Sequence, residues 1–243
     1  MLYDIQRFPV GHVNNYTYLI INTESGTGIL IDPAWEQKEI LDHIKKAHIE
    51  LKGILLTHSH QDHTNLADFF SKQYQCYVYM SKYEIEYYNF QCNNLVALED
   101  NQKLRVSGIE IECLLTPGHT TGSMCYKIEN ALFTGDTIFI RSCGFCNCKG
   151  GNPQDMFLSI KKLRQYAEQG ARIYPGHYFK NDFKYESDCL HRNIYFHIKD
   201  LEIFLKFVER SSKRNVYLKY EYYTGTYRNN TNNFKAGIVF TSI

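Results

Sequence analysis

Thr57-His58-Ser59-His60-Gln61-Asp62-His63 places four side chains that can bind metal within six residues, 58–63. The apolar run Gly53-Ile54-Leu55-Leu56 precedes this stretch and predicts a short buried strand. The cluster would then stand at the C-terminal end of a strand, where open α/β sheets hold their ligands. Each buried imidazole or carboxylate would otherwise need a partner of its own, whereas one metal ion can serve several of them. The stretch therefore predicts a metal site.

Three later segments supply further metal-binding side chains, each at a turn that Pro or Gly forces after a strand-like run. They are Pro117-Gly118-His119, Gly135-Asp136 and Pro175-Gly176-His177. Four strand ends are therefore expected to point toward one place. The combined set holds five histidines and two aspartates, which is enough for two metal ions with Asp136 between them.

The order of these motifs, from about Asp32 to Tyr178, resembles that of the metallo-β-lactamase superfamily. Within it, Gly135-Asp136-Thr137-Ile138-Phe139 followed by Cys143-Gly144-Phe145 resembles the glyoxalase II branch of thioester hydrolases. The resemblance implies an α/β fold, a four-layer αββα sandwich with a short helical C-terminal extension. The complete set of motifs is specific, whereas Pro-Gly-His alone would be weak.

The resemblance also implies which side chains bind metal. One ion would be held by His58, His60 and His119, the other by Asp62, His63 and His177, with Asp136 bridging both. The expected cofactor is two Zn²⁺ per chain, with iron or manganese as alternative metals. Asp32 follows the strand-like run 28–31, so it would either orient a ligand or be an ordinary turn aspartate.

The ligand set indicates hydrolysis without a serine or cysteine nucleophile. Two divalent ions would lower the pKa of a bound water to about 7, so that a metal-bound hydroxide could attack a carbonyl carbon. Asp136 would hold the pair of ions together, and Asp62 would orient as well as bind, so these two are the expected catalytic carboxylates. A thiol leaving group, with a pKa of about 8.5, needs little help from a general acid. The resemblance to the glyoxalase II branch implies that the substrate is an acyl thioester.

The identity of the thiol is expected to depend on Phe145 and Tyr178, the candidate substrate contacts. Glyoxalase II proteins carry a basic residue where Phe145 stands, so glutathione fits this chain less well than a phosphopantetheine arm or coenzyme A. In this respect the chain resembles the small zinc-dependent hydrolases of bacterial polyketide clusters. That resemblance implies the removal of acyl groups from acyl carrier proteins.

Several alternatives remain open. A hydroxyacylglutathione hydrolase has the same ligand set, and the run 138–144 also resembles mono-iron persulfide dioxygenases. A homoserine lactone lactonase shares the two-metal motif. A carrier-binding module without turnover is disfavoured, because its metal ligands would be expected to include at least one substitution. Cys143, Cys146 and Cys148 could form a zinc knot, although a fourth ligand at a recognisable spacing is missing.

Composition favours a compact protein in the cytoplasm. The chain has 243 residues and a formal net charge of +1, so no strong field attracts nucleic acid or a membrane. No segment approaches the roughly 20 apolar residues of a membrane span, and no signal peptide is evident at the N-terminus. Neither nucleic acid nor a membrane is therefore an expected partner.

Helices are expected at 36–48, 65–74, 82–89, 153–168, 186–196 and 200–208, and a strand at 76–80. Asn152 should cap the fourth helix and Pro153 should be its first residue. Residues 1–210 are expected to form the hydrolase domain. The Asn-rich tail 211–243 has a local charge of +4, which indicates either a solvated, partly flexible segment or a patch for an acidic carrier protein.

Overall fold

Two facing β-sheets form the centre of the structure, a computed structural model that describes residues 3–179 and 182–213. The first sheet has the order β1-β2-β3-β4-β5-β6 and the second the order β11-β10-β9-β8-β7. The strands of the first sheet are β1 Tyr3–Val10, β2 Asn15–Asn22, β3 Thr27–Ile31, β4 Glu50–Leu55, β5 Tyr77–Ser81 and β6 Leu95–Leu98. Those of the second are β7 Lys103–Val106, β8 Ile109–Leu115, β9 Met124–Ile128, β10 Ala131–Gly135 and β11 Arg172–Pro175.

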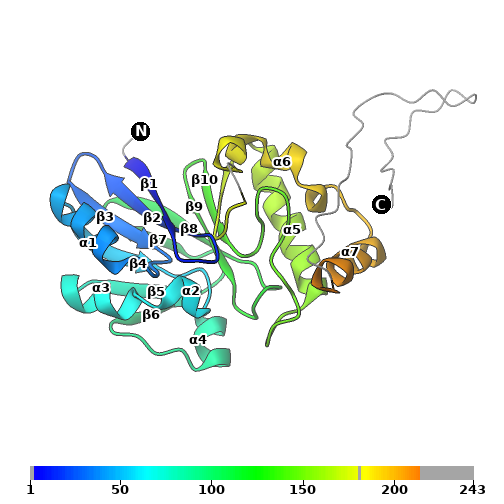
Figure 1. Cartoon of the computed structure of the whole chain (residues 1–243), viewed down its shortest axis with the longest axis horizontal. Coiled ribbons are helices and arrows are strands. Elements are labelled where there is room, and N and C mark those ends of the chain that lie inside the picture. The colour runs from blue at the N-terminus through cyan, green and yellow to red at the C-terminus, as the bar shows by residue number, and fades with distance from the viewer. Residues whose placement is uncertain (1–2, 180–181, 214–243) are drawn as a thin grey trace, which may run out of the picture.

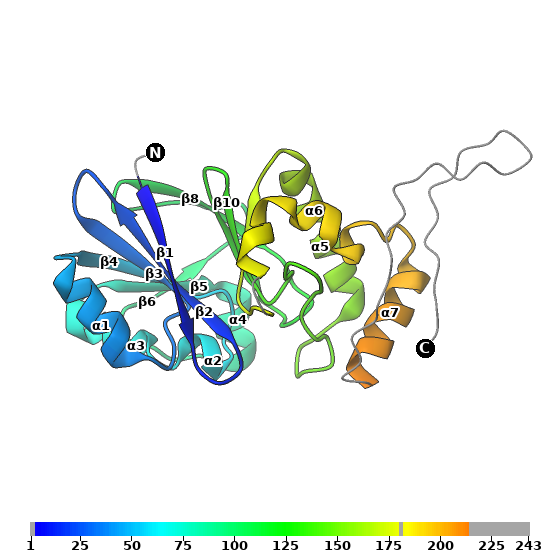
Figure 2. The same cartoon turned by 45° about the horizontal axis from the view of Figure 1, so that its top comes forward.

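Helices cover the outer faces of both sheets (Figure 1). They are α1 Gln37–Lys46, α2 Gln61–Thr64, α3 Ala67–Tyr74, α4 Lys82–Tyr88, α5 Pro153–Glu168, α6 Cys189–Arg192 and α7 Leu201–Lys213. Helices α1 and α3 lie on the first sheet, whereas α5, α6 and α7 lie beyond the second, as the turned view in Figure 2 also shows. The predicted four-layer αββα sandwich is therefore confirmed.

Three apolar cores fill the spaces between the four layers. Tyr18 and Tyr126 belong to the middle core between the sheets. Ile40 and Phe70 attach α1 and α3 to the first sheet, and Phe157 lies in the core between α5 and the second sheet. Burial of this apolar surface is the main force that holds the layers together.

Strand directions bring four chain segments to one edge of the sandwich. Strands β3, β4, β5 and β6 are mutually parallel, so β4 ends at the same edge as its neighbours. In the second sheet, β8 and β10 are both antiparallel to β9, and β11 is parallel to β10. The C-terminal ends of β8, β10 and β11 therefore share one edge. Met124 N donates to Thr57 O at 2.9 Å and joins the two sheets beside that edge.

Helix α5 begins and ends as its sequence predicts. The Asn152 side chain accepts hydrogen bonds from Gln154 N at 2.8 Å and Asp155 N at 3.2 Å, and Pro153 is the first helical residue. Gly170, with φ +91°, follows the C-terminal end. The Pro117 carbonyl accepts a hydrogen bond from Ser159 Oγ at 2.7 Å, which attaches the loop of His119 to this helix.

The structure differs from the sequence predictions at several elements. Strands β1 and β6 were not predicted, and Pro9 lies in β1 because that strand is at the edge of its sheet. The expected helix 186–196 is instead two 3₁₀ segments, Asp182–Asp188 and Ile194–Phe196, on either side of α6. Asn193 interrupts it, because its side chain accepts from Tyr195 N and donates to Phe139 O.

Helix α7 ends at Lys213, so the predicted division after residue 210 falls inside this helix. The expected basic tail lies outside the described residues from position 214 onward, including Arg214, Lys219, Glu221, Arg228 and Lys235. Among the helices that the structure describes, none is long and apolar enough to cross a membrane.

Candidate metal centre

The loops at the shared edge carry every predicted metal-binding side chain. The β4 loop and helix α2 supply four of them, and the loops after β8, β10 and β11 supply one each. The set is His58, His60, Asp62, His63, His119, Asp136 and His177. These side chains form three groups in which the ligand atoms lie within 4.8 Å of one another and could hold a metal ion. Two of the groups share no residue, and the third combines Asp136 with one histidine from each of them, His58 and His63.

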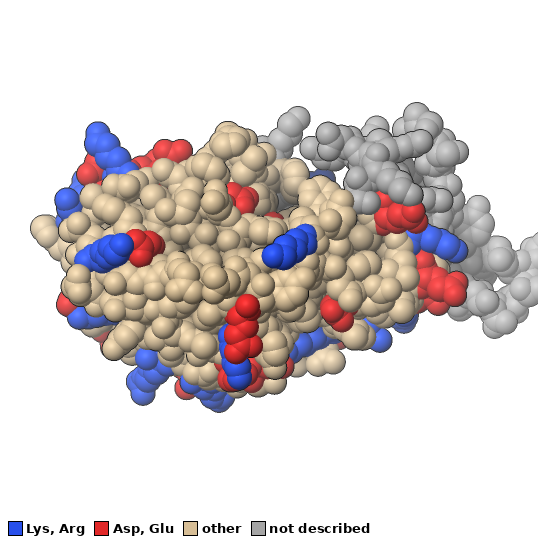
Figure 3. All heavy atoms as spheres, turned by 90° about the horizontal axis from the view of Figure 1, so that it is seen from below, with Lys and Arg blue, Asp and Glu red and all other residues tan. Residues whose placement is uncertain are grey.

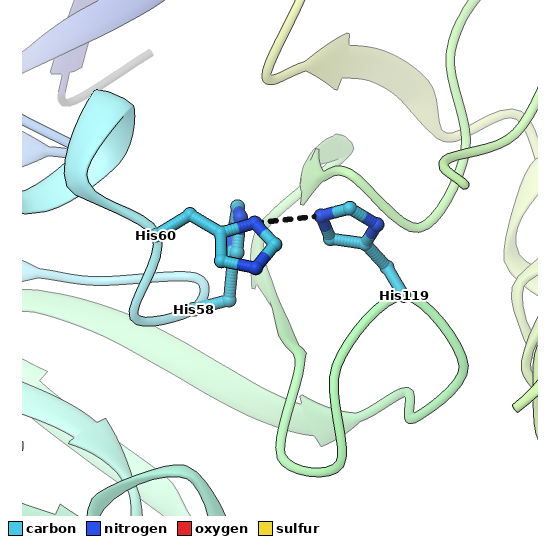
Figure 4. Close-up of side chains that lie close together, drawn as sticks. All are labelled: His58, His60 and His119. Carbon is cyan, nitrogen blue, oxygen red and sulfur yellow. Dashed lines mark hydrogen bonds between the residues drawn. The ribbon is translucent and has the colours of Figure 1, made fainter. Parts of the chain in front are cut away.

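The first group consists of His58, His60 and His119. Figure 4 shows their rings converging, with His60 and His119 on facing loops. His60 Nδ1 lies 3.0 Å from His119 Nε2. Direct contact between two ring nitrogens satisfies them only if one carries a proton, whereas a cation between them would bind both lone pairs.

The second group consists of Asp62, His63 and His177. Asp62 Oδ2 lies 3.4 Å from His177 Nε2 and 3.7 Å from His63 Nε2. The two Nε2 atoms are 3.3 Å apart. Tetrahedral zinc with ligand distances of about 2.1 Å requires its ligand atoms to be about 3.4 Å apart. The spacing of this group fits such an ion.

Asp136 lies between the two groups. Its Oδ2 atom is 3.5 Å from His119 Nε2 and 3.4 Å from His177 Nε2. Its Oδ1 atom is 3.4 Å from His63 Nε2. The carboxylate therefore contacts imidazoles from both groups, as a bridging ligand would.

Four of the five imidazoles have their Nδ1 atom fixed by a neighbour. His119 Nδ1 donates to Phe145 O at 2.6 Å and His177 Nδ1 to Val13 O at 2.9 Å. His63 Nδ1 donates to Asp32 Oδ2 at 2.9 Å, and His58 Nδ1 lies 3.1 Å from Thr57 Oγ1. The Nε2 lone pairs of these rings are therefore left for a ligand.

Two buried atoms of the cluster have no hydrogen-bond partner, His58 Nε2 and Asp136 Oδ1. Thr57 Oγ1 donates to Asp32 Oδ2 at 2.6 Å, so it can only accept from His58 Nδ1, and Nε2 of that ring carries a lone pair. A buried lone pair and a buried carboxylate oxygen without partners are both destabilising. A bound cation would satisfy them, so these residues fit a metal.

Electrostatics indicate the same requirement for positive charge. Burial, followed by the influence of His63, holds the pKa of His58 well below its usual value. Burial alone would lower the pKa of His177, but Asp136 and Asp62 raise it to about 11. Without a metal, a proton on His177 therefore balances the two carboxylates. A divalent ion would replace that proton.

Asp32 orients a predicted ligand, which is the first of the two roles expected for it. It is buried, and its carboxylate accepts from Thr57 N at 2.8 Å as well as from His63 Nδ1. Its backbone has φ +49°, a left-handed conformation that aspartate tolerates better than most residues.

Two buried residues of the site were missed by the sequence analysis. Asn15 donates through Nδ2 to Asp62 O at 3.0 Å and to Asp62 Oδ2 at 3.1 Å. Glu84 accepts from Ser59 N at 2.8 Å and from Gly122 N at 2.9 Å, so it joins the loop of His58 and His60 to the loop after His119. The sequence signal that could have found Asn15 is its place at the end of the polar segment 11–15, directly before the apolar run 16–21.

The two predicted substrate contacts lie beside the cluster in different environments. The Phe145 carbonyl accepts a hydrogen bond from His119, and Phe145 is 56% exposed. The ring of Tyr178 stacks on Tyr16 with centroids 4.5 Å apart. Among the described residues, no group of three or more metal-binding side chains contains a cysteine, so the alternative zinc knot at Cys143, Cys146 and Cys148 finds no support.

Comparison with known families and curated proteins identifies the relatives of the chain. The family described as Metallo-beta-lactamase superfamily matches residues 10–91 and 99–177. The "Probable polyketide biosynthesis zinc-dependent hydrolase PksB" of Bacillus subtilis is 42% identical over 204 residues, which is 84% of this chain and 91% of the relative. BaeB of Bacillus velezensis, with the same description, is 41% identical over 88% of this chain and 97% of its own length.

More distant similarities include a protein named for a different activity and a solved structure. A "Probable hydroxyacylglutathione hydrolase" of Schizosaccharomyces pombe is 31% identical over 79% of this chain and 75% of the relative. Among solved structures, ETHE1 from Myxococcus xanthus superposes with a TM-score of 0.73 at 24% identity, covering 88% of this chain and 93% of that one. At this identity the similarity to ETHE1 concerns the fold alone.

Proposed function

Because the chain belongs to the metallo-β-lactamase superfamily, we propose that it is a zinc-dependent hydrolase that binds two ions and cleaves an acyl thioester. The single observation that carries the proposal is the position of Asp136 between two groups of ligand atoms, each of a size that could hold one ion. PksB and BaeB are described as zinc-dependent hydrolases, which supports the choice of metal.

Zinc, when bound, would supply an activated water and would polarise the carbonyl of the substrate. The protein contributes the orientation of the ligands. Asp32 and the carbonyls of Phe145 and Val13 hold three imidazoles with their Nε2 atoms toward the centre. Asp136 and Asp62 supply two negative charges, which would partly balance the positive charge of the ions. Such prior orientation reduces the reorganisation that the reaction requires.

Apolar side chains next to the ligands support a substrate without a strongly charged thiol half. Phe145 and Val13, whose carbonyls bind His119 and His177, are 56% and 43% exposed, and Phe179, two residues after His177, is 38% exposed. A glutathione thioester would place two carboxylates beside these apolar side chains, whereas the phosphopantetheine arm is uncharged near its thiol. Figure 3 shows the molecule from below, where acidic and basic side chains are interspersed and neither kind gathers into a patch.

The natural substrate in this proposal is an acyl group carried on the phosphopantetheine arm of an acyl carrier protein, in the cytoplasm. It is supported by the description of PksB and BaeB as hydrolases of polyketide biosynthesis. Acyl chains in such biosynthesis are carried as thioesters. Hydrolysis would return the carrier thiol and release the acid. Phe145 and Tyr178 are the proposed contacts to the substrate.

A panel of thioesters tests the proposal. Zinc-loaded protein is given an acyl carrier protein thioester, the same acyl group on coenzyme A, and S-lactoylglutathione, and thiol release is measured. The carrier thioester should be cleaved with the highest kcat/KM, and a His58→Ala variant should be at least about 100-fold slower. Equal inactivity of both proteins on every substrate would favour a module that binds carriers without turnover.

Hydroxyacylglutathione hydrolysis is the second candidate. The relative from Schizosaccharomyces pombe and a cytoplasmic isozyme of Saccharomyces cerevisiae, 32% identical over 72% of this chain and 68% of the relative, carry that description. If S-lactoylglutathione were cleaved faster than the carrier thioester, this candidate would replace the first. One iron per chain with consumption of oxygen would instead support a persulfide dioxygenase.

A further inference from the structure

We infer that Asn15 is a positioning residue for the second ion, a role that rests on the proposed two-ion centre. Asn15 is the first residue of β2 and is 1% exposed. Its amide nitrogen lies close to every ligand atom of the second group: 3.1 Å from Asp62 Oδ2 and 3.4 Å from the Nε2 atoms of both His63 and His177. No ligand atom of the first group is among its contacts in the described part of the chain.

The orientation of the Asn15 amide is set by Asp62. The backbone carbonyl and the carboxylate of Asp62 can only accept hydrogen bonds, so the group facing them at 3.0 and 3.1 Å must be the NH₂ end. The opposite atom, Asn15 Oδ1, is buried without a hydrogen-bond partner. Burial of an unpartnered amide oxygen is unfavourable. The contact with Asp62 therefore determines the orientation of this side chain, although that orientation leaves Asn15 Oδ1 without a hydrogen bond.

The backbone around Asn15 is attached to the loop of His177. Asn15 and His177 form an isolated antiparallel β-bridge, and Tyr16 N donates to Gly176 O at 2.8 Å. Tyr178 N donates to Asn14 O at 2.9 Å. The segments on either side of this bridge are thus held together by main-chain bonds. The Asn15 side chain extends that connection to α2, which carries Asp62 and His63.

Asn15 therefore fixes the carboxylate of Asp62 relative to His177. The oxygen that receives its hydrogen bond, Oδ2, is the same oxygen that belongs to the second group of ligand atoms. Without this bond the carboxylate could rotate about its side-chain torsions, and an ion would have to restrict that motion on binding. Loss of an outer hydrogen bond to a metal ligand typically lowers metal affinity about 10- to 100-fold.

The test measures zinc affinity and not turnover. Metal-free wild type, Asn15→Ala and Asn15→Leu are equilibrated with zinc at graded, chelator-buffered concentrations, and bound zinc per chain is determined. Leucine keeps the branched shape of asparagine and fills its space but has no donor, so it tests the lost hydrogen bond without leaving a cavity. The control is Asn14→Gly, since Asn14 is exposed and has φ +62°, which glycine adopts readily. Thermal unfolding of the metal-free proteins verifies that each variant is folded.

Both Asn15 variants should bind the first zinc within about threefold of the wild-type affinity and the second about 10- to 100-fold more weakly. Asn14→Gly should bind both ions as wild type does. If Asn15→Leu bound two ions with wild-type affinities, the role of Asn15 would be refuted, and the proposal of a two-ion centre would still be supported. If the wild type itself bound a single ion, the two-ion proposal would be refuted together with the role of Asn15.

Discussion

The Oδ2 atom of Asp32 accepts hydrogen bonds from His63 Nδ1 at 2.9 Å and from Thr57 Oγ1 at 2.6 Å. Thr57 Oγ1 in turn lies 3.1 Å from His58 Nδ1. One carboxylate oxygen thus orients an imidazole of each candidate metal group, His63 directly and His58 through the hydroxyl. A carboxylate bound to a ligating histidine fixes its ring and raises its basicity. Asp32 should therefore influence both ions, whereas Asn15 should influence one.

Replacement of Asp32 by asparagine should weaken both zinc sites. Asparagine tolerates the left-handed backbone at this position, so the substitution changes the charge and one acceptor but not the shape. We expect each affinity to fall about 10- to 100-fold in the chelator-buffered titration. Thr57→Val should weaken the first site alone, because His63 keeps its bond to Asp32. Loss of the second site alone in Asp32→Asn would contradict this account.

Glu84 should contribute strongly to stability. Its carboxylate is fully buried and accepts from Ser59 N, Ser59 Oγ and Gly122 N. Glu84→Ala removes three hydrogen bonds to a carboxylate, each worth about 1.5 to 3 kcal/mol, and leaves the buried Gly122 N–H unpaired. The free energy of unfolding in urea should fall by about 3 kcal/mol or more. Glu86→Ala, at an exposed position of the same helix, should change it by no more than about 0.5 kcal/mol.

Gly118 should not tolerate a side chain. A Cβ atom there would lie 2.4 Å from Met156 Cα, and the backbone has φ +143°. Because Met156 Cα belongs to helix α5, relief requires the loop of His119 to move away. Gly118→Ala should lower both the midpoint of thermal unfolding and the zinc affinity of the first site. Gly170→Ala, where φ is +91° and no atom lies within 4 Å, should lower stability without changing zinc affinity.

Unfolding should become easier at alkaline pH. Burial raises the pKa of Tyr3 to about 12 and that of Cys113 to about 12, both in the core between the sheets. The unfolded chain releases these protons near pH 10 and 9, so above those values it binds fewer protons than the folded protein. The stability due to this difference is present below about pH 9 and is lost as pH rises toward 12. Urea unfolding at pH 8, 9 and 10 measures it, and a free energy that increased with pH would be inconsistent with the burial of these groups.

The meeting of the seven side chains could be predicted from the sequence, because their segments follow strand-like runs that end at one edge. The αββα layers were predicted from the resemblance to a known superfamily and not from the pattern of residues. Helix α5 was predicted with its cap, since Asn152 and Pro153 act locally. The roles of Asn15 and Glu84 were not predicted, because their hydrogen-bond partners lie far away in the sequence. No neighbouring residue in the sequence indicates that either side chain is buried. Asn193 interrupts the expected helix 186–196 through contacts that only the tertiary structure provides.

Thiol release during stepwise addition of zinc to metal-free protein tests the central claim most directly. With an acyl carrier protein thioester as substrate, the rate should rise steeply and level off at two zinc ions per chain. Asp136→Ala, which removes the carboxylate between the two groups, should remain at least about 100-fold slower throughout the titration. A maximal rate at one zinc per chain, or no release of thiol at any zinc concentration, would contradict a two-zinc thioester hydrolase.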